Sequence, residues 1–221
     1  AVKQDIHPSQ EYFIYKTIIL RNLYGVDIMN EAVEIAKLRL FLKLVAAVQL
    51  DTRKANFGLE PLPDIDFNIR CGNTLIGFAT MGQMREGLRY DIEGAAHLPQ
   101  IEEQCTLIAQ AFEHFKTIQL NPGDDHKSFV AAKRQLQKRL DKLNEGLNTF
   151  LAKTYGILDK EKVITIEVKE GKETKNLPAG RQGKRVNQYE HWLSTHQPFH
   201  WLAEYYEIIV KRGGFDVIIG N

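Results

Sequence analysis

Apolar side chains recur at helical spacing in four stretches of the chain, which are residues 11–24, 30–49, 99–119 and 128–153. In each stretch they fall mostly three or four positions apart, the pattern of an amphipathic helix. Leucines in the last stretch alternate steps of four and three, as in two helices packed along their length: Leu136, Leu140, Leu143 and Leu147. The turn-forming run at 121–125 separates the last two stretches, so we expect an antiparallel helical hairpin.

Three shorter apolar runs, at 23–28, 66–71 and 215–219, have the length of strands. The first of them lacks strict alternation, which indicates a parallel strand that is buried on both faces. Because the first two runs flank the predicted helix at 30–49, the beginning of the chain predicts a strand–helix–strand unit with a right-handed crossover. We expect the run at 215–219 to join the same sheet as its third strand.

These elements divide the chain into three expected parts. Residues 1–80 form a partial α/β core, residues 81–206 form a large and mainly helical insertion, and residues 207–221 return to the core as a strand. The stretch 189–206 is rich in aromatic residues and histidine, and we expect it to pack the insertion back against the sheet.

A predicted strand and a basic loop follow the hairpin. Residues 163–168 alternate between apolar and polar positions, as an exposed strand does. Residues 169–187 contain Gly and Pro, carry several Lys and Arg, and have few large apolar side chains, so we expect a mobile loop. Such a loop could contact DNA phosphates, although a solvated surface loop needs no partner.

The composition is that of a globular protein, with 43% hydrophobic and 26% charged residues. The formal net charge is only +1, so contact with nucleic acid would require a local basic patch. No apolar run approaches the roughly 20 residues needed to span a bilayer, and no membrane partner is expected. Cys71 and Cys105 lie far apart and form no Cys-x-x-Cys motif, which favours a reducing cytoplasm over a disulfide framework.

Polar residues lie at or just beyond the carboxyl ends of the three predicted strands: Asp27, Asn73 and Asn221. An acid at the carboxyl end of a strand is where Rossmann-type domains bind ribose hydroxyls, but Asp27 could equally cap the following helix. Asn73 could reach the exocyclic amine of a bound adenine, or could act simply as a turn residue. Because the carboxyl ends of parallel strands meet at one edge, we expect all three residues to open onto one nucleoside-sized hollow.

Three histidines near the end of the insertion suggest a metal site. They are His191, His196 and His200, the last two of which are four positions apart. The neighbouring Trp192 and Phe199 indicate packing instead. We therefore expect no bound metal.

Three sequence blocks, taken together, resemble a known enzyme family. They are LYGVDIMNEAVEIAKLRLFL, DFNIRCGNTLIG and GGFDVIIGN, in this order. They are similar to the second motif, the third motif and the lead-in to the catalytic Asn-Pro-Pro-Tyr of the Eco57I-like DNA adenine-N6 methyltransferases of combined restriction-modification enzymes. The resemblance implies an α/β fold, namely a partial Rossmann-like, S-adenosylmethionine-dependent methyltransferase core interrupted by a large, mainly helical insertion. It also implies double-stranded DNA as the partner.

The resemblance also implies a role for individual residues. Asp27 would bind the ribose of S-adenosylmethionine, and Ile28 would pack on its adenine ring. Asn73 would hydrogen-bond the adenine amine of the cofactor, with Thr74 beside the ring. Asn221 would be the catalytic residue and would accept a hydrogen bond from the N6 amine of a target adenine that is flipped out of the duplex.

Two parts of the family pattern have no counterpart in this sequence. The Gly-rich first motif should precede Ile18, and a Pro-Pro-Tyr should follow Asn221. We therefore expect an internal fragment that neither methylates nor cleaves DNA by itself. Two other functions stay open: a non-enzymatic helical module that binds DNA or protein, and a nicotinamide-binding Rossmann enzyme. The DNA site, the presence of a nuclease and the oligomeric state cannot be predicted.

Overall fold

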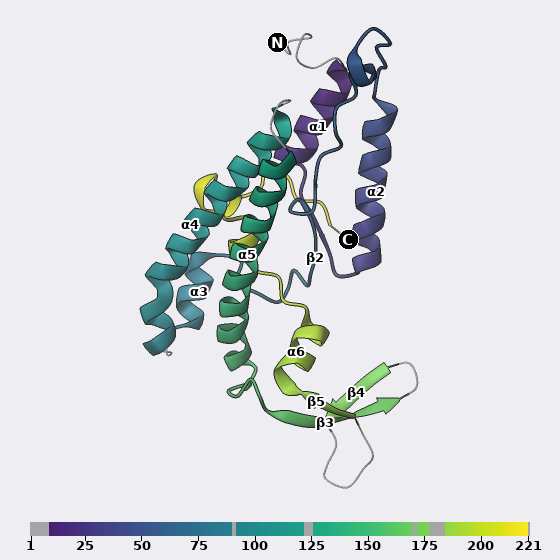
Figure 1. The fold of residues 1–221 in the computed structure, drawn as a ribbon. Helices are drawn as coiled ribbons and strands as arrows, with labels where there is room; N and C mark the ends of the chain where they lie inside the picture. The colour runs from purple at the N-terminus through teal and green to yellow at the C-terminus, as the bar shows by residue number, and fades with distance from the viewer. Residues whose placement is uncertain (1–8, 90–91, 122–125, 170–171, 177–183, 221) are drawn as a thin grey trace.

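The computed structural model describes most of the chain, in five segments: residues 9–89, 92–121, 126–169, 172–176 and 184–220. Helices dominate these segments, and the strands form two small, separate sheets (Figure 1). Within them, no helix combines the length and the apolar composition needed to cross a membrane.

The strand–helix–strand unit predicted for the beginning of the chain is confirmed. Helix α1 (Gln10–Asn22) leads into β1 (Gly25–Asp27), helix α2 (Asn30–Ala46) and β2 (Ile69–Cys71). The two strands pair in parallel, with Gly25 opposite Ile69 and Asp27 opposite Cys71. Apolar side chains from α1, α2 and β2 form the core of this unit: Tyr12, Ile19, Leu20, Val33, Leu44 and Ile69. The first part of the chain is therefore a small α/β unit.

The third strand predicted for this sheet is wrong. Residues 216–220 have no regular secondary structure, and the segment before them, Glu207–Lys211, is a π-helical turn rather than a strand. Val217, Ile218 and Ile219 expose 75%, 81% and 91% of their surface. Among the described residues β1 pairs with β2 alone, so these residues have neither a neighbouring strand nor a layer that covers them. In the described part of the chain, the sheet of the α/β unit has two strands, and a Rossmann core is not established.

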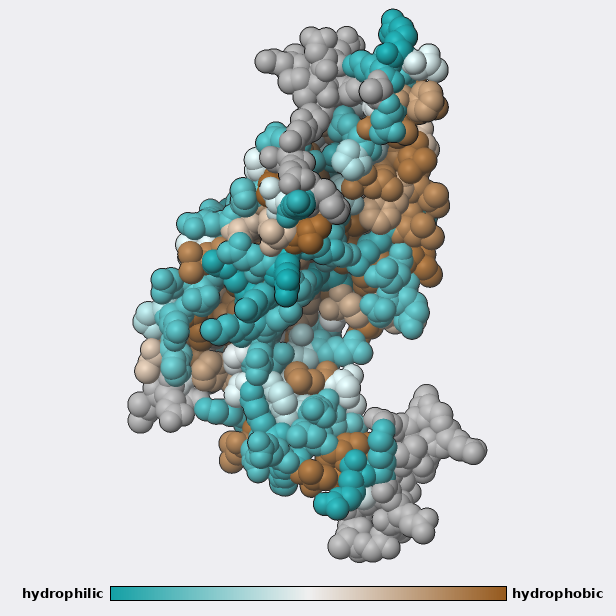
Figure 2. Space-filling model, viewed as in Figure 1, coloured by the Kyte–Doolittle hydropathy of each residue, from teal (hydrophilic) through white to brown (hydrophobic). Residues whose placement is uncertain are grey.

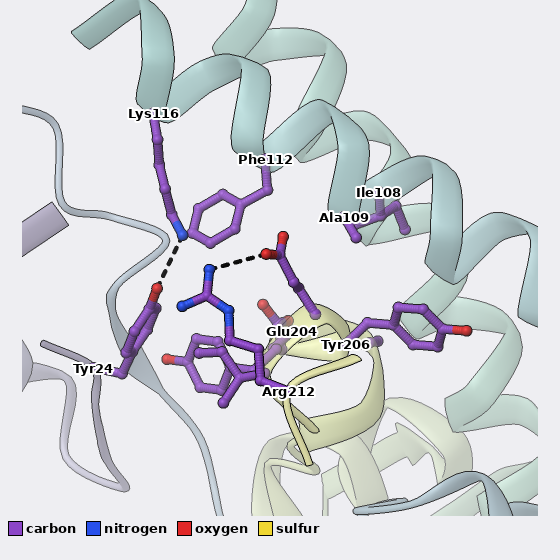
Figure 3. A pocket seen from close by; sticks show the side chains of 12 residues that line it. Tyr24, Ile108, Ala109, Phe112, Lys116, Glu204, Tyr206 and Arg212 are labelled. Carbon is purple, nitrogen blue, oxygen red and sulfur yellow. Dashed lines mark hydrogen bonds and ion pairs between the residues drawn. The ribbon is translucent and has the colours of Figure 1, made fainter. Parts of the chain in front are cut away.

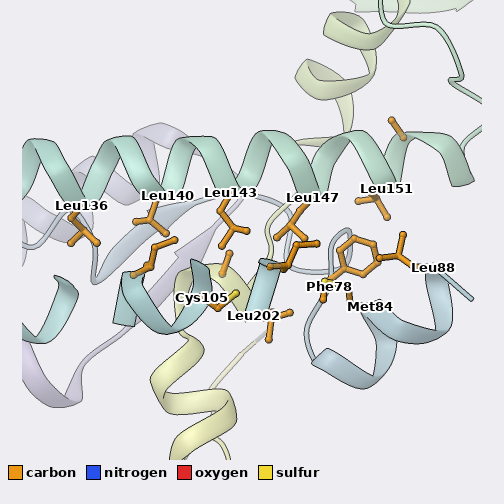
Figure 4. Close-up of a cluster of buried hydrophobic side chains, with 14 of the residues drawn as sticks. Phe78, Met84, Leu88, Cys105, Leu136, Leu140, Leu143, Leu147, Leu151 and Leu202 are labelled. Atoms are coloured by element: carbon orange, nitrogen blue, oxygen red, sulfur yellow. The ribbon is translucent and has the colours of Figure 1, made fainter. Parts of the chain in front are cut away.

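The predicted helical hairpin is confirmed and is longer than expected. Helices α4 (Ile92–Leu120) and α5 (His126–Thr154) run antiparallel (Figure 1). The leucine seam of α5 points into their common core, together with Leu151 and with residues of the short helix α3 (Met81–Gly87) (Figure 4). Leu136 and Leu147 are completely buried there. The hairpin therefore contains the largest hydrophobic core of the described residues.

The strand predicted at 163–168 is confirmed, but the loop predicted at 169–187 is partly wrong. Strands β3 (Val163–Lys169), β4 (Lys172–Asn176) and β5 (Lys184–Asn187) form an antiparallel sheet in the order β4-β3-β5. Residues 170–171 and 177–183 of that predicted loop lie outside the described residues. Backbone pairing with β3 thus orders two segments that have no apolar pattern of their own.

Two short helices return the chain to the α/β unit, as the aromatic stretch predicted. They are α6 (Gln188–His196) and α7 (Trp201–Glu204). Phe199 and Tyr205, which flank α7, are buried and pack against Tyr24 and Val26 at β1. The insertion is thus joined to the sheet through this segment.

Candidate functional site

Asp27 lies at the carboxyl end of β1, and its side chain is exposed. Its Oδ1 accepts a hydrogen bond from the backbone N–H of Met29 at 2.8 Å, which holds the turn from the strand into α2. The helix begins at Asn30, and its N-cap residue, Met29, makes no side-chain cap bond. Asp27 thus both shapes the turn and presents a carboxylate to the solvent.

The turn after β2 lies directly beside Asp27. The N–H of Gly72 donates to the backbone oxygen of Asp27 at 2.9 Å. A Cβ atom at Gly72 would lie 2.9 Å from Cβ of Phe199, so only glycine fits beneath that ring. The register brings Asn73 within two residues of the position opposite Asp27.

The backbone of Asn73 and Thr74 is held from outside the sheet. The N–H of Asn73 donates to the oxygen of Gln197 at 2.7 Å, and the indole N–H of Trp201 donates to the oxygen of Thr74 at 3.3 Å. Oδ1 of Asn73 accepts from the N–H of Leu75 at 3.1 Å, which is the bond of a turn asparagine. Asn73 is therefore a turn residue in this structure, and its amide lies at the same sheet edge as Asp27.

Ile28 and Thr74 are exposed beside these two residues, so the four predicted cofactor contacts share an open edge rather than an enclosed cavity. Cys71 lies between them, and its thiol donates to the oxygen of Ile28 at 3.5 Å. Partial burial and the nearby carboxylates of Asp27 and Glu31 raise the pKa of the Cys71 thiol. A thiol with a raised pKa is a poor nucleophile at neutral pH, so the chemistry of this edge is binding and orientation.

The catalytic residue predicted at Asn221 lies outside the described residues. The tail that leads to it begins near β1, because the ring of Phe215 packs edge to face on Tyr24 with a centroid distance of 5.8 Å. Tyr24 directly precedes β1. The structure therefore connects the start of the tail to the strand that carries Asp27, and it does not place Asn221.

A buried polar cluster packs beside β1 and β2, and it was not predicted from the sequence. Lys116 of α4 is 3% exposed and donates to the hydroxyl of Tyr24 at 2.9 Å (Figure 3). It also donates to Glu113 at 2.9 Å. Arg70 of β2 pairs with Glu204 at 3.0 Å. These charges sit among apolar positions, where a sequence pattern cannot show which of them will be paired.

A small cavity lies within this cluster, lined by residues that include Tyr24, Lys116 and Arg212 (Figure 3). Its volume is about 20 Å³, enough for about one water molecule. A nucleoside cannot enter it. The open strand edge at Asp27 is therefore the candidate site, and the cluster is its support.

His200 supports the turn after β2 through both of its ring nitrogens. Its Nδ1 accepts from the N–H of Phe78 at 3.1 Å, so the proton resides on Nε2, which donates to Oδ1 of Asn148 at 2.9 Å. Burial lowers the pKa of His200 to about 4. His196 stacks on Trp192 with a centroid distance of 5.7 Å. The packing interpretation is confirmed for these two histidines.

Two comparisons with known proteins bear on this site. The family model described as Eco57I restriction-modification methylase matches residues 21–221, which include both strands and the whole insertion. The chain belongs to this methylase family. A putative type II restriction enzyme and methyltransferase, RM.MjaORFECS2P of Methanocaldococcus jannaschii, is 32% identical in an alignment of 242 positions that covers 96% of this chain. No solved structure gives a significant match.

The chain spans only 19% of the length of the relative from Methanocaldococcus jannaschii. Most of that relative therefore has no counterpart in this chain.

Proposed function

We propose that this chain supplies part of the cofactor site and the target-base asparagine of an S-adenosylmethionine-dependent DNA adenine-N6 methyltransferase. The observation that carries the proposal is the parallel pairing of β1 and β2, which puts Asp27 and the Asn73 turn at one sheet edge. Ligands of parallel α/β sheets bind beyond the carboxyl ends of the strands. The methylase family supplies the reaction class.

The residues at this edge fit the nucleoside part of S-adenosylmethionine. Asp27 uses Oδ1 for the Met29 amide, which leaves Oδ2 to accept from a ribose hydroxyl. The side chain of Ile28 is 52% exposed next to it and offers an apolar surface for an adenine ring. Oδ1 of Asn73 has a second lone pair that can accept from the adenine amine, with Thr74 beside the ring.

The residues of this chain act by binding and orientation. S-adenosylmethionine, when bound, supplies an electrophilic methyl group. Asp27 and Asn73 would fix the nucleoside end of the cofactor relative to the sheet. Asn221, proposed from its motif, would accept a hydrogen bond from the N6 amine of an adenine extruded from double-stranded DNA. That bond would keep the lone pair of the amine directed at the methyl carbon, so the rate enhancement comes from positioning and electrostatics. The enzyme would act in the cytoplasm.

Cys71 offers a direct test of cofactor binding. Its thiol is exposed and lies opposite Asp27, whereas Cys105 is completely buried and has its pKa raised to about 12 by burial. A thiol reagent should therefore label Cys71 selectively. Cofactor bound at Asp27 and Asn73 should cover it, so that S-adenosylmethionine at ten times its Kd slows labelling about tenfold.

Two variants show whether this protection depends on the proposed contact. Asp27→Ala should abolish protection by S-adenosylmethionine, while Glu31→Gln should keep it. Both changes remove a carboxylate that raises the pKa of Cys71, so the ratio of labelling rates with and without cofactor isolates the binding effect. Equal labelling with and without S-adenosylmethionine, or protection that survives Asp27→Ala, would refute the proposal. Protection by a nicotinamide dinucleotide alone would favour the Rossmann-enzyme alternative.

A further inference from the structure

The amino-terminal half of α5 presents a dense group of cations on the outer face of the hairpin. Residues 127–142 contain six Lys or Arg residues against one acid, a net charge of +5, while the whole chain carries only +1. The rest of the chain is therefore net acidic. Hydrophilic side chains cover the face over α5 in Figure 2, and a shallow hollow there is lined by Lys127, Val130, Ala131, Arg134, Gln135 and Lys138.

Five of these six cations form no ion pair with a described residue: Lys127, Arg134, Lys138, Arg139 and Lys142. The acids nearest in sequence are engaged elsewhere, because Asp141 accepts from Gln137 at 2.6 Å and Glu145 pairs with Lys160 at 3.8 Å. Arg134, Lys138 and Lys142 follow each other at intervals of four, where like charges destabilise a helix. The arrangement therefore opposes helix stability, and an anionic partner would relieve it.

The geometry of α5 makes these cations a rigid row. Lys127, Arg134 and Lys138 fall on one face of the helix, about 10 Å and 6 Å apart along its axis. The intervening Lys133 is held by the carboxylates of Asp64 and Asp66, and Asp66 also pairs with Lys37 of α2 at 2.8 Å. Because Asp64 and Asp66 lie five and three residues before β2, this network ties the row to the strand that leads to Asn73.

We propose that this row, Lys127, Arg134 and Lys138, is a binding surface for the phosphate backbone of duplex DNA, an inference that rests on the proposed function. A row of unpaired cations on a rigid helix suits a polyanion with regularly spaced charges. The hollow is lined by no aromatic side chain on which unpaired bases could stack, which favours a duplex over a single strand. The apolar stripe of α5 is buried in the hairpin, so the helix has no apolar face for a lipid surface.

The test is the salt dependence of DNA binding by the whole chain, measured by fluorescence anisotropy with a labelled duplex of arbitrary sequence. Each lost phosphate contact should lower the slope of log K against log salt by about 0.9. The double variant Arg134→Ala/Lys138→Ala should therefore lose about 2 units of slope and bind about tenfold more weakly at low salt. Alanine preserves helix propensity, so the fold should be retained.

Two control variants separate local contacts from general charge. Arg39→Ala/Lys162→Ala removes two exposed cations elsewhere and should leave the slope close to that of the wild type. Arg134→Lys/Lys138→Arg keeps the charge of the row and should keep most of the slope. The proposal is overturned if the chain does not bind duplex DNA at low salt, if both alanine pairs behave alike, or if a single strand or an anionic lipid vesicle binds more tightly than the duplex.

The Asp27→Ala variant distinguishes this inference from the proposed function. It should bind duplex DNA as the wild type does, because Asp27 is not part of the row. Conversely, Arg134→Ala/Lys138→Ala should keep the protection of Cys71 by S-adenosylmethionine. Loss of cofactor protection with intact, row-dependent DNA binding would refute only the cofactor assignment, and the reverse result would refute only the DNA surface.

Discussion

The hairpin of α4 and α5 and the C-terminal segment 215–219 differ sharply, although both were predicted from apolar residues. The seam of α5 is buried as expected, with Leu136 and Leu147 inaccessible to solvent. In the C-terminal segment, Ile218 and Ile219 are almost fully exposed, and no strand forms. The apolar pattern was thus sufficient to predict the helices of the hairpin but insufficient to predict the structure of residues 215–219.

The difference lies in where the backbone hydrogen bonds are made. A helix satisfies its own N–H and C=O groups, and one antiparallel neighbour then buries its apolar stripe. A buried strand has to obtain both its hydrogen bonds and its covering layers from other segments. Among the described residues nothing pairs with 215–219 or with the second edge of β1. A helix can therefore be predicted from a local pattern, whereas a buried strand cannot be predicted without its neighbours.

The largest effect in this comparison should come from the hairpin core. Leu147→Ala removes a completely buried side chain and leaves a cavity, so the free energy of unfolding should fall by about 3–4 kcal/mol. The matched control is Leu158→Ala, since Leu158 is 83% exposed and its loss should cost less than about 0.5 kcal/mol. Urea unfolding followed by circular dichroism measures both changes. Similar losses for the two leucines would show that Leu147 is not part of a packed hydrophobic core.

The residues of the candidate site could be predicted only where the elements that carry them could be predicted. Asp27 and the Asn73 turn could be predicted because they end a unit whose helix packs on its own two strands. Asn221 was predicted on a strand that does not form, so its position relative to Asp27 stays a prediction. The bonds of His200 to Phe78 and Asn148 join segments far apart in the chain, and no local pattern indicates them. What the sequence could not show were contacts that depend on tertiary packing.

A pH-dependent loss of stability should come next in size, at the contact between α5 and the turn after β2. His200 bridges these two parts in its neutral form, and burial lowers its pKa to about 4 from an unfolded value near 6.5. The unfolded chain therefore binds more protons between these values. Stability is fully present above about pH 6.5 and falls as the pH drops toward 4, by about 3 kcal/mol in total.

His200→Gln provides the check on that pH dependence. Glutamine does not titrate, so the variant should be less stable than the wild type near neutral pH but should lose less stability between about pH 6.5 and 4. Urea unfolding of both proteins across this range gives the two profiles. If the variant loses as much stability as the wild type over this interval, His200 is not the group responsible.

The smallest effect should come from the C-terminal segment, and it completes the comparison. Ile219 is 91% exposed, so Ile219→Ser should change the free energy of unfolding by less than about 0.5 kcal/mol. Ile19 of α1 is only 5% exposed, and Ile19→Ser should cost several times more, because it removes buried apolar surface and buries a hydroxyl. The same urea titration measures both. A cost for Ile219→Ser that matched the cost for Ile19→Ser would mean that the segment is packed in solution, and the contrast between a self-sufficient helix and a dependent strand would then fail for this chain.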